Sequence, residues 1–278
     1  GSGSSLSFDG TNDYVALTKM DASDNNGFSF SLWVKKQTAL PSSGNYESII
    51  RQDLNGNPDF MLQFTGNNKL AFGFNSSLTS YSELLVDISA SDYIDKWVHI
   101  AGTYVPSTSI QYLYVNGAQV GTNNNHSGTG PSGTTNYVLH IGNSPHSSNS
   151  EFLDGDIDEV GIWNEALTAA EITALYNSGN GLSASANSGN YTSATNLQGY
   201  WNMNEGSGNT INDVSSNSNN GTNNGASWVS GSSLALAATQ FNWTYDNVAP
   251  TMAITATNGS SAVADGATTN DATLTLTF

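Results

Sequence analysis

The chain has 278 residues, of which 23 are acidic and only 6 basic, so its formal net charge is −17. Six basic residues cannot form the clustered cationic surface that nucleic acids require, which excludes nucleic acid as a partner and argues against an anionic membrane surface. Cysteine is absent, which excludes disulfides, thiolate metal sites and cysteine nucleophiles. Secreted animal modules usually carry a disulfide, so the composition favours an exported bacterial protein. The apolar run at 234–238 is far shorter than the roughly 20 residues of a membrane span, so we predict no membrane insertion.

Short apolar stretches separated by Asn, Gly and Ser turns extend from residue 6 to about residue 230, which is typical of an all-β domain. The predicted strands, in chain order, cover residues 28–34, 46–51, 60–64, 69–74, 97–104, 111–120 and 137–141. The clearest hairpin lies within the sixth stretch, because Asn116 and Gly117 supply the two positive-φ residues of a type I′ turn. We therefore predict an all-β jelly-roll sandwich of two antiparallel sheets.

An acidic stretch that leads into an apolar strand, DGDIDEVGIWN, occupies residues 154–164. The apolar residues of 160–163 predict a strand. Thr168, followed by Glu171 three residues later, forms a capping box, which predicts one short helix over about 168–176.

Together with LSFDGTNDYV at residues 6–15, the acidic stretch closely resembles the laminin-G-like branch of the concanavalin A-like lectin folds. The resemblance covers about residues 6–230 and implies a concanavalin-like jelly roll with one short helix. Residues 197–222 are similar to a strand and Asx-loop element of this family, placed last here, so residues 226–229 would close the sandwich. The family binds diverse ligands, so the resemblance predicts the fold and not the ligand.

The resemblance also implies a structural calcium ion, because in relatives the first strand and the Asp-Glu-Val strand lie side by side. Calcium takes about six to eight oxygen ligands. The expected ligands are Asp9 and Asp158, with Asn12, Asp13 and Asp156 as secondary candidates. The alternative is that these side chains cap turns through Asx hydrogen bonds without a metal.

Concanavalin-like folds also include glycoside hydrolases, which pair two carboxylates about 5 Å apart in retaining enzymes. Asp154, Asp156 and Asp158 share one side of the predicted strand. A catalytic motif of this kind would carry glutamate at its two ends, where this chain has aspartate. The histidines come without a nucleophile elbow or a triad order, and His99 is expected to be packed inside its strand. We therefore predict no catalytic residues and no enzymatic activity.

Sugar recognition requires exposed aromatic faces beside hydrogen-bonding side chains. Four tryptophans lie inside predicted strands and are expected in the core: Trp33, Trp97, Trp163 and Trp201. Tyr46, Tyr81 and Tyr93 lie nearer to loops and are the predicted ligand-binding aromatic residues. The polar loops 123–135 and 144–149 are long enough to frame a ligand.

The expected organisation is a laminin-G-like domain at 1–232, a linker at 233–248 and a partial immunoglobulin-like segment at 249–278. Strands predicted at 251–256 and 272–278 resemble the start of a bacterial immunoglobulin-like repeat. A complete domain of that type needs roughly 7 strands and about 100 residues. The segment is therefore either a truncated domain or a pair of strands that adds to the sheet edge of another molecule.

The sequence thus predicts a non-catalytic extracellular module for carbohydrate binding or adhesion, in a large bacterial surface or secreted protein. Its expected partner is a glycan or surface polymer, and its expected cofactor is a structural Ca²⁺ ion. One alternative is a structural spacer or filament subunit that contacts other copies of itself or neighbouring domains through the C-terminal strands. A polysaccharide hydrolase is a further alternative.

Overall fold

A computed structural model of the chain describes residues 3–20, 26–54, 57–77, 80–124, 138–145, 151–230, 257–258 and 261–262. For some of these residues only the backbone is described, namely 54, 57, 74–77, 80–82, 257–258 and 261–262. The chain divides into two compact units, Gly1–Thr239 and Gln240–Phe278. In the second unit, β17 (Thr257–Asn258) and β18 (Ser261–Ala262) pair as a short hairpin. The strands predicted at 251–256 and 272–278 lie outside the described residues.

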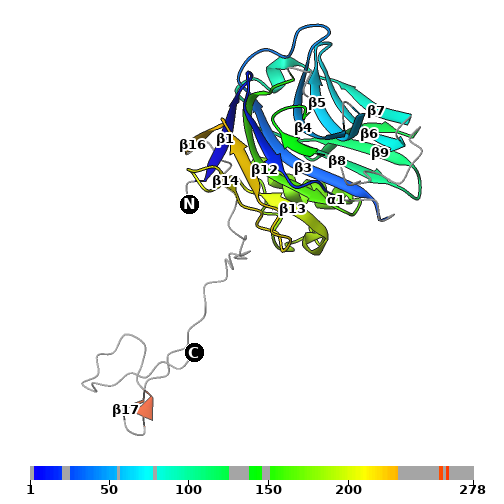
Figure 1. Ribbon diagram of the computed structural model, residues 1–278. Coiled ribbons are helices and arrows are strands. Elements are labelled where there is room, and N and C mark those ends of the chain that lie inside the picture. Colours follow the sequence, from blue (N-terminus) through cyan, green and yellow to red (C-terminus); the bar gives the residue numbers. More distant parts are fainter. Residues whose placement is uncertain are drawn as a thin grey trace. The chain divides into compact units, whose positions relative to one another are not determined.

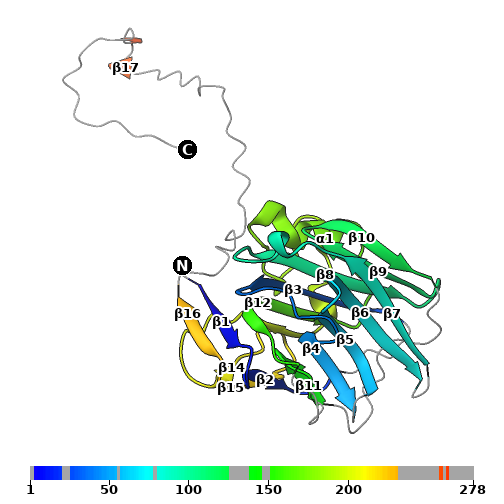
Figure 2. The same cartoon turned by 90° about the horizontal axis from the view of Figure 1, so that it is seen from above.

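Two antiparallel sheets face each other in the first unit (Figures 1 and 2). Within the described residues, eight strands form sheet A, in the order β10 (Ala118–Asn123), β9 (Ile110–Val115), β8 (Val98–Val105), β3 (Phe28–Lys36), β12 (Asp154–Trp163), β1 (Ser4–Asp9) and β16 (Ser227–Ser230), with β13 (Leu197–Trp201) also paired to β12. Eight described strands likewise form sheet B, in the order β14 (Thr210–Ile211), β15 (Gly221–Asn224), β2 (Tyr14–Leu17), β11 (Val138–Ile141), β4 (Tyr46–Leu54), β5 (Asn57–Thr65), β6 (Lys69–Ser77) and β7 (Ser80–Asp87). The predicted jelly-roll sandwich is confirmed.

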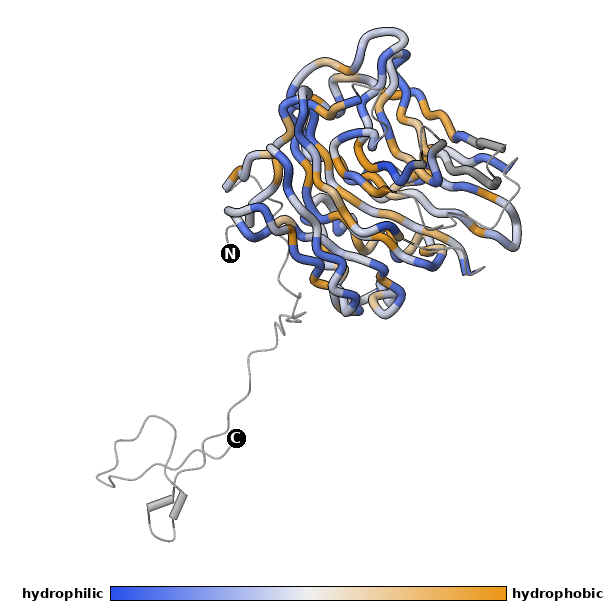
Figure 3. Tube along the Cα trace, in the orientation of Figure 1, coloured by the Kyte–Doolittle hydropathy of each residue, from blue (hydrophilic) through white to orange (hydrophobic). Residues whose placement is uncertain are grey.

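The hydrophobic core lies between the two sheets, because alternate residues of each strand point inward. Hydrophobic and hydrophilic residues alternate along the strands in Figure 3. Phe28 and Phe30 of β3 pack against Phe60 and Phe72 of sheet B, with ring centroids 4.8 and 5.0 Å apart. Gly102 leaves the room that this packing needs, since a Cβ atom there would lie 2.4 Å from the Phe30 ring. Burial of each such ring stabilises the fold by roughly 1.5–3 kcal/mol.

The short helix α1 (Ala169–Tyr176) covers the outer face of sheet A, on the side away from sheet B (Figure 2). Its predicted capping box is confirmed: Thr168 Oγ1 accepts from the Glu171 backbone N–H, and the Glu171 carboxylate accepts from the Thr168 N–H at 2.9 Å. The described residues also form three short 3₁₀ helices: η1 (Ala90–Asp92), η2 (Asn177–Gly179) and η3 (Ala194–Asn196). None of the described helices is long and apolar enough to span a bilayer.

Most of the predicted strands form, and two further predictions are confirmed at single elements. Asn116 and Gly117 have φ angles of 50° and 75°, as the type I′ turn requires. The strand β16 pairs with β1 and closes the sandwich, as predicted for 226–229. The sequence reasoning missed β7, whose mixture of serine, acidic and apolar residues shows no clear period of two.

Three of the four tryptophans expected in the core are buried, namely Trp33, Trp163 and Trp201. Trp97 is only partly buried, and the Lys35 ammonium lies 5.2 Å from its ring centroid. Trp97 precedes β8 instead of lying within it, which leaves one face of its ring for this cation–π contact.

Candidate functional site

The two acidic segments do lie side by side, as the resemblance implied. β1 pairs with β12 in antiparallel register, which sets Asp9 opposite Asp154. Asp9 Oδ1 accepts from the backbone N–H groups of Thr11 and Asn12, at 2.8 and 3.4 Å, and Asp13 Oδ2 accepts from the Asp9 N–H at 3.1 Å. Burial, more than any neighbouring charge, raises the pKa of Asp13. This is the geometry of an Asx turn.

The carboxylates on β12 are also engaged with the protein. Asp156 forms an ion pair with Lys35 at 2.7 Å and accepts from Gln37 Nε2 at 2.6 Å. Asp158 is fully buried and accepts from the Glu159 N–H at 2.9 Å. Among the described residues, no group of three or more His, Cys, Asp or Glu side chains is placed to hold a metal. The described arrangement does not fit a calcium cage, and the calcium ion stays a prediction.

The next residue, Glu159, has an environment that the sequence did not predict. It lies at a bulge where the register between β12 and β3 shifts, and its φ of 55° is in the left-handed region. The Tyr200 hydroxyl donates to its carboxylate. Burial raises the pKa of Glu159 to about 8, so the group is protonated at neutral pH. The Glu159 side chain is therefore held in the interior by Tyr200, and the residue is 6% exposed.

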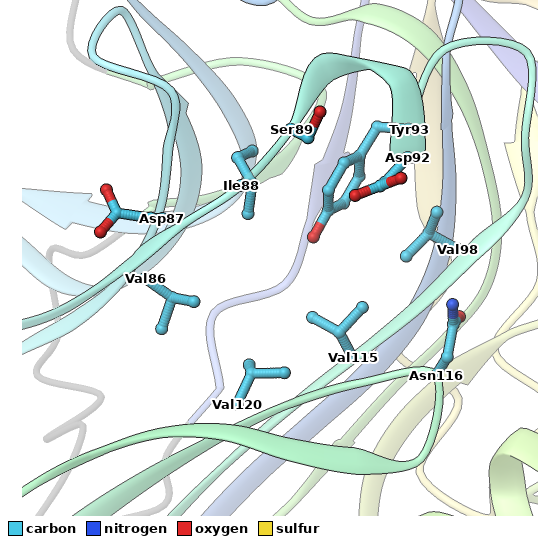
Figure 4. A pocket seen from close by; sticks show the side chains of 10 residues that line it. All are labelled: Val86, Asp87, Ile88, Ser89, Asp92, Tyr93, Val98, Val115, Asn116 and Val120. Carbon is cyan, nitrogen blue, oxygen red and sulfur yellow. The ribbon is translucent and has the colours of Figure 1, made fainter.

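A pocket of about 270 Å³ opens where the edges of the two sheets separate, between β7 and the hairpin of β9 and β10, next to η1 (Figure 4). Its walls consist mainly of branched aliphatic side chains: Val86, Ile88, Val98, Val115 and Val120. Val120 is 42% exposed and forms part of the mouth. Apolar walls with a few polar groups are typical of small-ligand sites.

The edges of the two sheets approach each other closely beside the pocket. A Cβ atom at Gly121 would lie 2.6 Å from Val86 and 3.1 Å from Leu84, so only glycine permits this approach. Nearby, Asn123 Nδ2 donates to the Glu83 carbonyl oxygen at 3.4 Å and joins the two edges. Towards η1 the edges separate, and the gap between the sheets is left open there.

Tyr93 is the main polar group inside the pocket. Its ring packs edge-on against Phe64, with centroids 5.5 Å apart, and only 3% of the residue is exposed. Its hydroxyl points into the cavity (Figure 4) and makes no hydrogen bond within the described part of the chain. Burial, and secondly the charge of Asp92, raises the pKa of Tyr93 to about 12, so the hydroxyl stays a donor at neutral pH.

Two further polar side chains face the same cavity. The exposed Asp92 carboxylate lies alongside the Tyr93 ring in Figure 4. Asn116 Oδ1 accepts from the His99 backbone N–H at 3.0 Å, which leaves the Asn116 Nδ2 group available to a ligand. His99 itself is fully buried, as expected for a packed histidine.

The three tyrosines predicted as ligand residues have different positions. The expectation that Tyr93 lies at the surface is wrong, because the turn η1 folds its ring over Phe64; it nevertheless lines the pocket. Tyr46 begins β4 and is 43% exposed, but it does not line this pocket. Tyr81 pairs with Asn75 in the β6–β7 ladder, and its side chain lies outside the described residues.

A second pocket, of about 350 Å³, is lined by polar residues alone: Asn26, Asn164, Glu165 and Asn196. Asn196 donates to the Glu165 carboxylate, so part of its hydrogen-bonding capacity is already used. The described lining of this second pocket offers no apolar wall on which a ligand could pack. The pocket beside Tyr93 is therefore the better candidate site.

Two facing antiparallel sheets, with edge loops around a small pocket, define a jelly-roll binding fold. The chain belongs to the concanavalin A-like lectin/glucanases superfamily, whose laminin-G-type family model matches residues 9–173. No curated protein sequence matches the chain.

The solved structures that are similar to this chain share little sequence with it. A "putative carbohydrate binding protein" from Bacteroides ovatus ATCC 8483 is 16% identical, with a TM-score of 0.62 over 85% of this chain. The match spans 60% of the length of that protein. A heptameric SAP-like pentraxin from Limulus polyphemus is 16% identical, with a TM-score of 0.46, over 63% of this chain and 82% of its own. The binding domain of botulinum neurotoxin serotype D is 16% identical, with a TM-score of 0.49, over 64% of this chain and 43% of its own.

Proposed function

We propose that this domain is a non-catalytic carbohydrate-binding module of an exported bacterial protein, and that it holds a sugar residue in the pocket beside Tyr93. The observation that carries the proposal is the Tyr93 hydroxyl, which points into the pocket from a residue that is only 3% exposed and has no hydrogen-bond partner among the described residues. A hydrogen-bonding group in an apolar pocket is available to fix the orientation of a ligand. Membership of the lectin/glucanase superfamily and the fold shared with the Bacteroides ovatus protein support a glycan as the ligand.

The chemistry of the walls suits one sugar ring. A pyranose has an apolar C–H face, which can pack on Val115 and Val120, and hydroxyl groups at its edge. Those hydroxyls can bond to Tyr93 Oη, the Asp92 carboxylate and Asn116 Nδ2. A cavity of about 270 Å³ is slightly smaller than the sites of drug-sized ligands, which begin at about 300 Å³. The pocket therefore holds a single sugar residue of a longer chain.

A hydrolytic role has less support than binding. Of the three aspartates considered for catalysis, Asp158 is fully buried and Asp156 is held by Lys35. Neither can be presented to a glycosidic bond without breaking these contacts.

The proposed location at the bacterial surface and the proposed role in adhesion rest on the composition of the chain. Fractionation of cells that express the parent protein tests the location.

Substitution Tyr93→Phe tests the site directly. A glycan array first identifies the bound sugar, and titration calorimetry then compares the variant with the wild type. We expect Tyr93→Phe to weaken glycan binding about three- to tenfold, because one neutral hydrogen bond contributes about 0.5–1.5 kcal/mol. The melting temperature should stay equal, since phenylalanine keeps the contact with Phe64 and the lost hydroxyl has no partner among the described residues.

The matched control is Tyr46→Phe, which removes a tyrosine hydroxyl outside the pocket and should leave binding unchanged. Equal affinities of wild type and Tyr93→Phe would show that the pocket is not the glycan site. An array without any binding would overturn the proposed function itself.

A further inference from the structure

We propose that the pocket beside Tyr93 selects an amino sugar whose amine is charged, in preference to a neutral or acidic sugar. This inference rests on the proposed carbohydrate-binding function and names the class of sugar. It follows from the charge distribution around the cavity, from the position of one carboxylate, and from the Tyr93 hydroxyl that points into the cavity.

The described lining of the pocket includes two carboxylates, Asp87 and Asp92, and no Lys, Arg or His. Asp87 points away from the cavity in Figure 4 and forms an ion pair with Lys69 at 2.5 Å. The other nearby cation, Lys96, donates to the Ser91 carbonyl oxygen at 2.7 Å. Asp92 is therefore the carboxylate that faces the cavity, and its side chain has no ion pair among the described residues.

The position of Asp92 at the rim suits an ammonium group better than a deeper position would. A charge carried into the apolar interior would lose its hydration, which costs several kcal/mol per ion in a buried pair. At the rim, the ammonium group keeps part of its water while it contacts the Asp92 carboxylate. The apolar face of the ring then packs on Val115 and Val120, and the Tyr93 hydroxyl bonds to an oxygen of the ring substituents.

The same arrangement disfavours an acidic sugar. A uronate carboxylate at this rim would face Asp92 without any described lining cation to balance it. The chain as a whole carries a net charge of −17, which repels anionic glycans and attracts cationic ones before contact. Salt screens this attraction, with a Debye length of about 8 Å at physiological ionic strength, so binding should weaken as salt is added.

The experiment compares sugars that differ only in charge. The probes are D-glucosamine and D-galactosamine, their N-acetyl derivatives as neutral analogues, and D-glucuronate as the anion, at mildly acidic pH where the amine is protonated. Binding is followed through the NMR signals of the valine methyl groups at Val86, Val115 and Val120. We expect shifts at these methyls with the amino sugars, weaker shifts with the neutral analogues, and none with the uronate.

Two matched variants locate the selecting charge. Asp92→Asn should lower the affinity for the amino sugar about fivefold, as expected for one partly exposed ion pair, and should leave the neutral analogues unaffected. Asp87→Asn removes the carboxylate that points away and should change neither affinity.

The possible outcomes distinguish the selection for an amine from the carbohydrate-binding function. Equal binding of charged and neutral sugars at the pocket methyls would overturn the selection for an amine and leave the carbohydrate site in place. Amino sugar binding that is unchanged in both Asp92→Asn and Tyr93→Phe would place the amine elsewhere and overturn the inference. Absence of binding by every probe, together with a silent glycan array, would overturn the proposed function as well.

Discussion

At the level of single residues, the buried pair of Glu159 and Tyr200 makes the stability of this domain depend on pH. Burial raises the pKa of Glu159 from its ordinary value of 4.5 to about 8. In the unfolded chain the group loses its proton near pH 4.5, whereas in the folded chain it keeps the proton until about pH 8. The folded state therefore binds more protons between these values, and the free energy of unfolding falls as the pH rises through this window.

The substitution Glu159→Gln tests this dependence, because glutamine resembles the protonated acid and cannot ionise. We expect equal stability of variant and wild type near pH 4, below this window, and a more stable variant at pH 8. Urea denaturation at the two pH values measures the difference. The control Asp92→Asn replaces an exposed carboxylate and should not remove the pH dependence. Parallel pH profiles of wild type and Glu159→Gln would contradict the assignment.

The sequence predicted where the acidic residues lie but not what they bind. That the two segments lie side by side was implied by the resemblance to laminin-G-like domains, and the pairing of β1 with β12 confirms it. The Asx turn around Asp9 was one of two open alternatives. The bulge at Glu159 could not be predicted, because it interrupts the period of two from which strand faces are inferred. Asp156 is bound by Lys35 of β3 and by Gln37 just after that strand, more than a hundred residues earlier in the chain. No local pattern indicates these partners.

At the level of elements, Glu171 joins helix α1 to a later loop. Its carboxylate accepts from the backbone and the hydroxyl of Thr168 at 2.9 Å, from the same groups of Thr192 at 3.2 and 3.1 Å, and from the Ser193 hydroxyl at 2.6 Å. Burial alone would raise the pKa of Glu171, but these hydrogen bonds outweigh it and lower the pKa. The stabilisation is therefore lost as the pH falls below about 4.5.

We expect Glu171→Ala to lower the free energy of unfolding by about 2–3 kcal/mol. A helix cap contributes about 1 kcal/mol, and loss of the carboxylate leaves the buried Ser193 hydroxyl and the part-buried donors of Thr168 and Thr192 without an acceptor. Urea denaturation at neutral pH measures the loss. Thr173→Ala, an exposed position on the same helix, is the control and should change stability by less than about 0.5 kcal/mol. Similar losses in both variants would show that α1 is insensitive to its cap.

The capping box could be predicted because its two residues are three positions apart, whereas the contacts of Glu171 with Thr192 and Ser193 could not. The candidate pocket was not predicted for the same reason. Its walls come from β7, η1 and the hairpin of β9 and β10, and they meet only because Gly121 allows two sheet edges to approach. Local patterns predict elements, whereas the pocket depends on how those elements pack.

At the level of the whole molecule, a bound calcium ion would stabilise the folded state against the unfolded state. A ligand at a concentration of a hundred times its Kd adds about 2.7 kcal/mol, which raises the melting temperature by several degrees. Because Asp9 caps its own turn and Asp156 pairs with Lys35, we expect the protein to melt at the same temperature in millimolar calcium and in EDTA. Differential scanning calorimetry makes the comparison, with Asp9→Ala as the variant: loss of the turn cap should lower the melting temperature equally in calcium and in EDTA. A calcium-dependent rise that EDTA reverses and Asp9→Ala abolishes would instead establish the metal site predicted from the sequence.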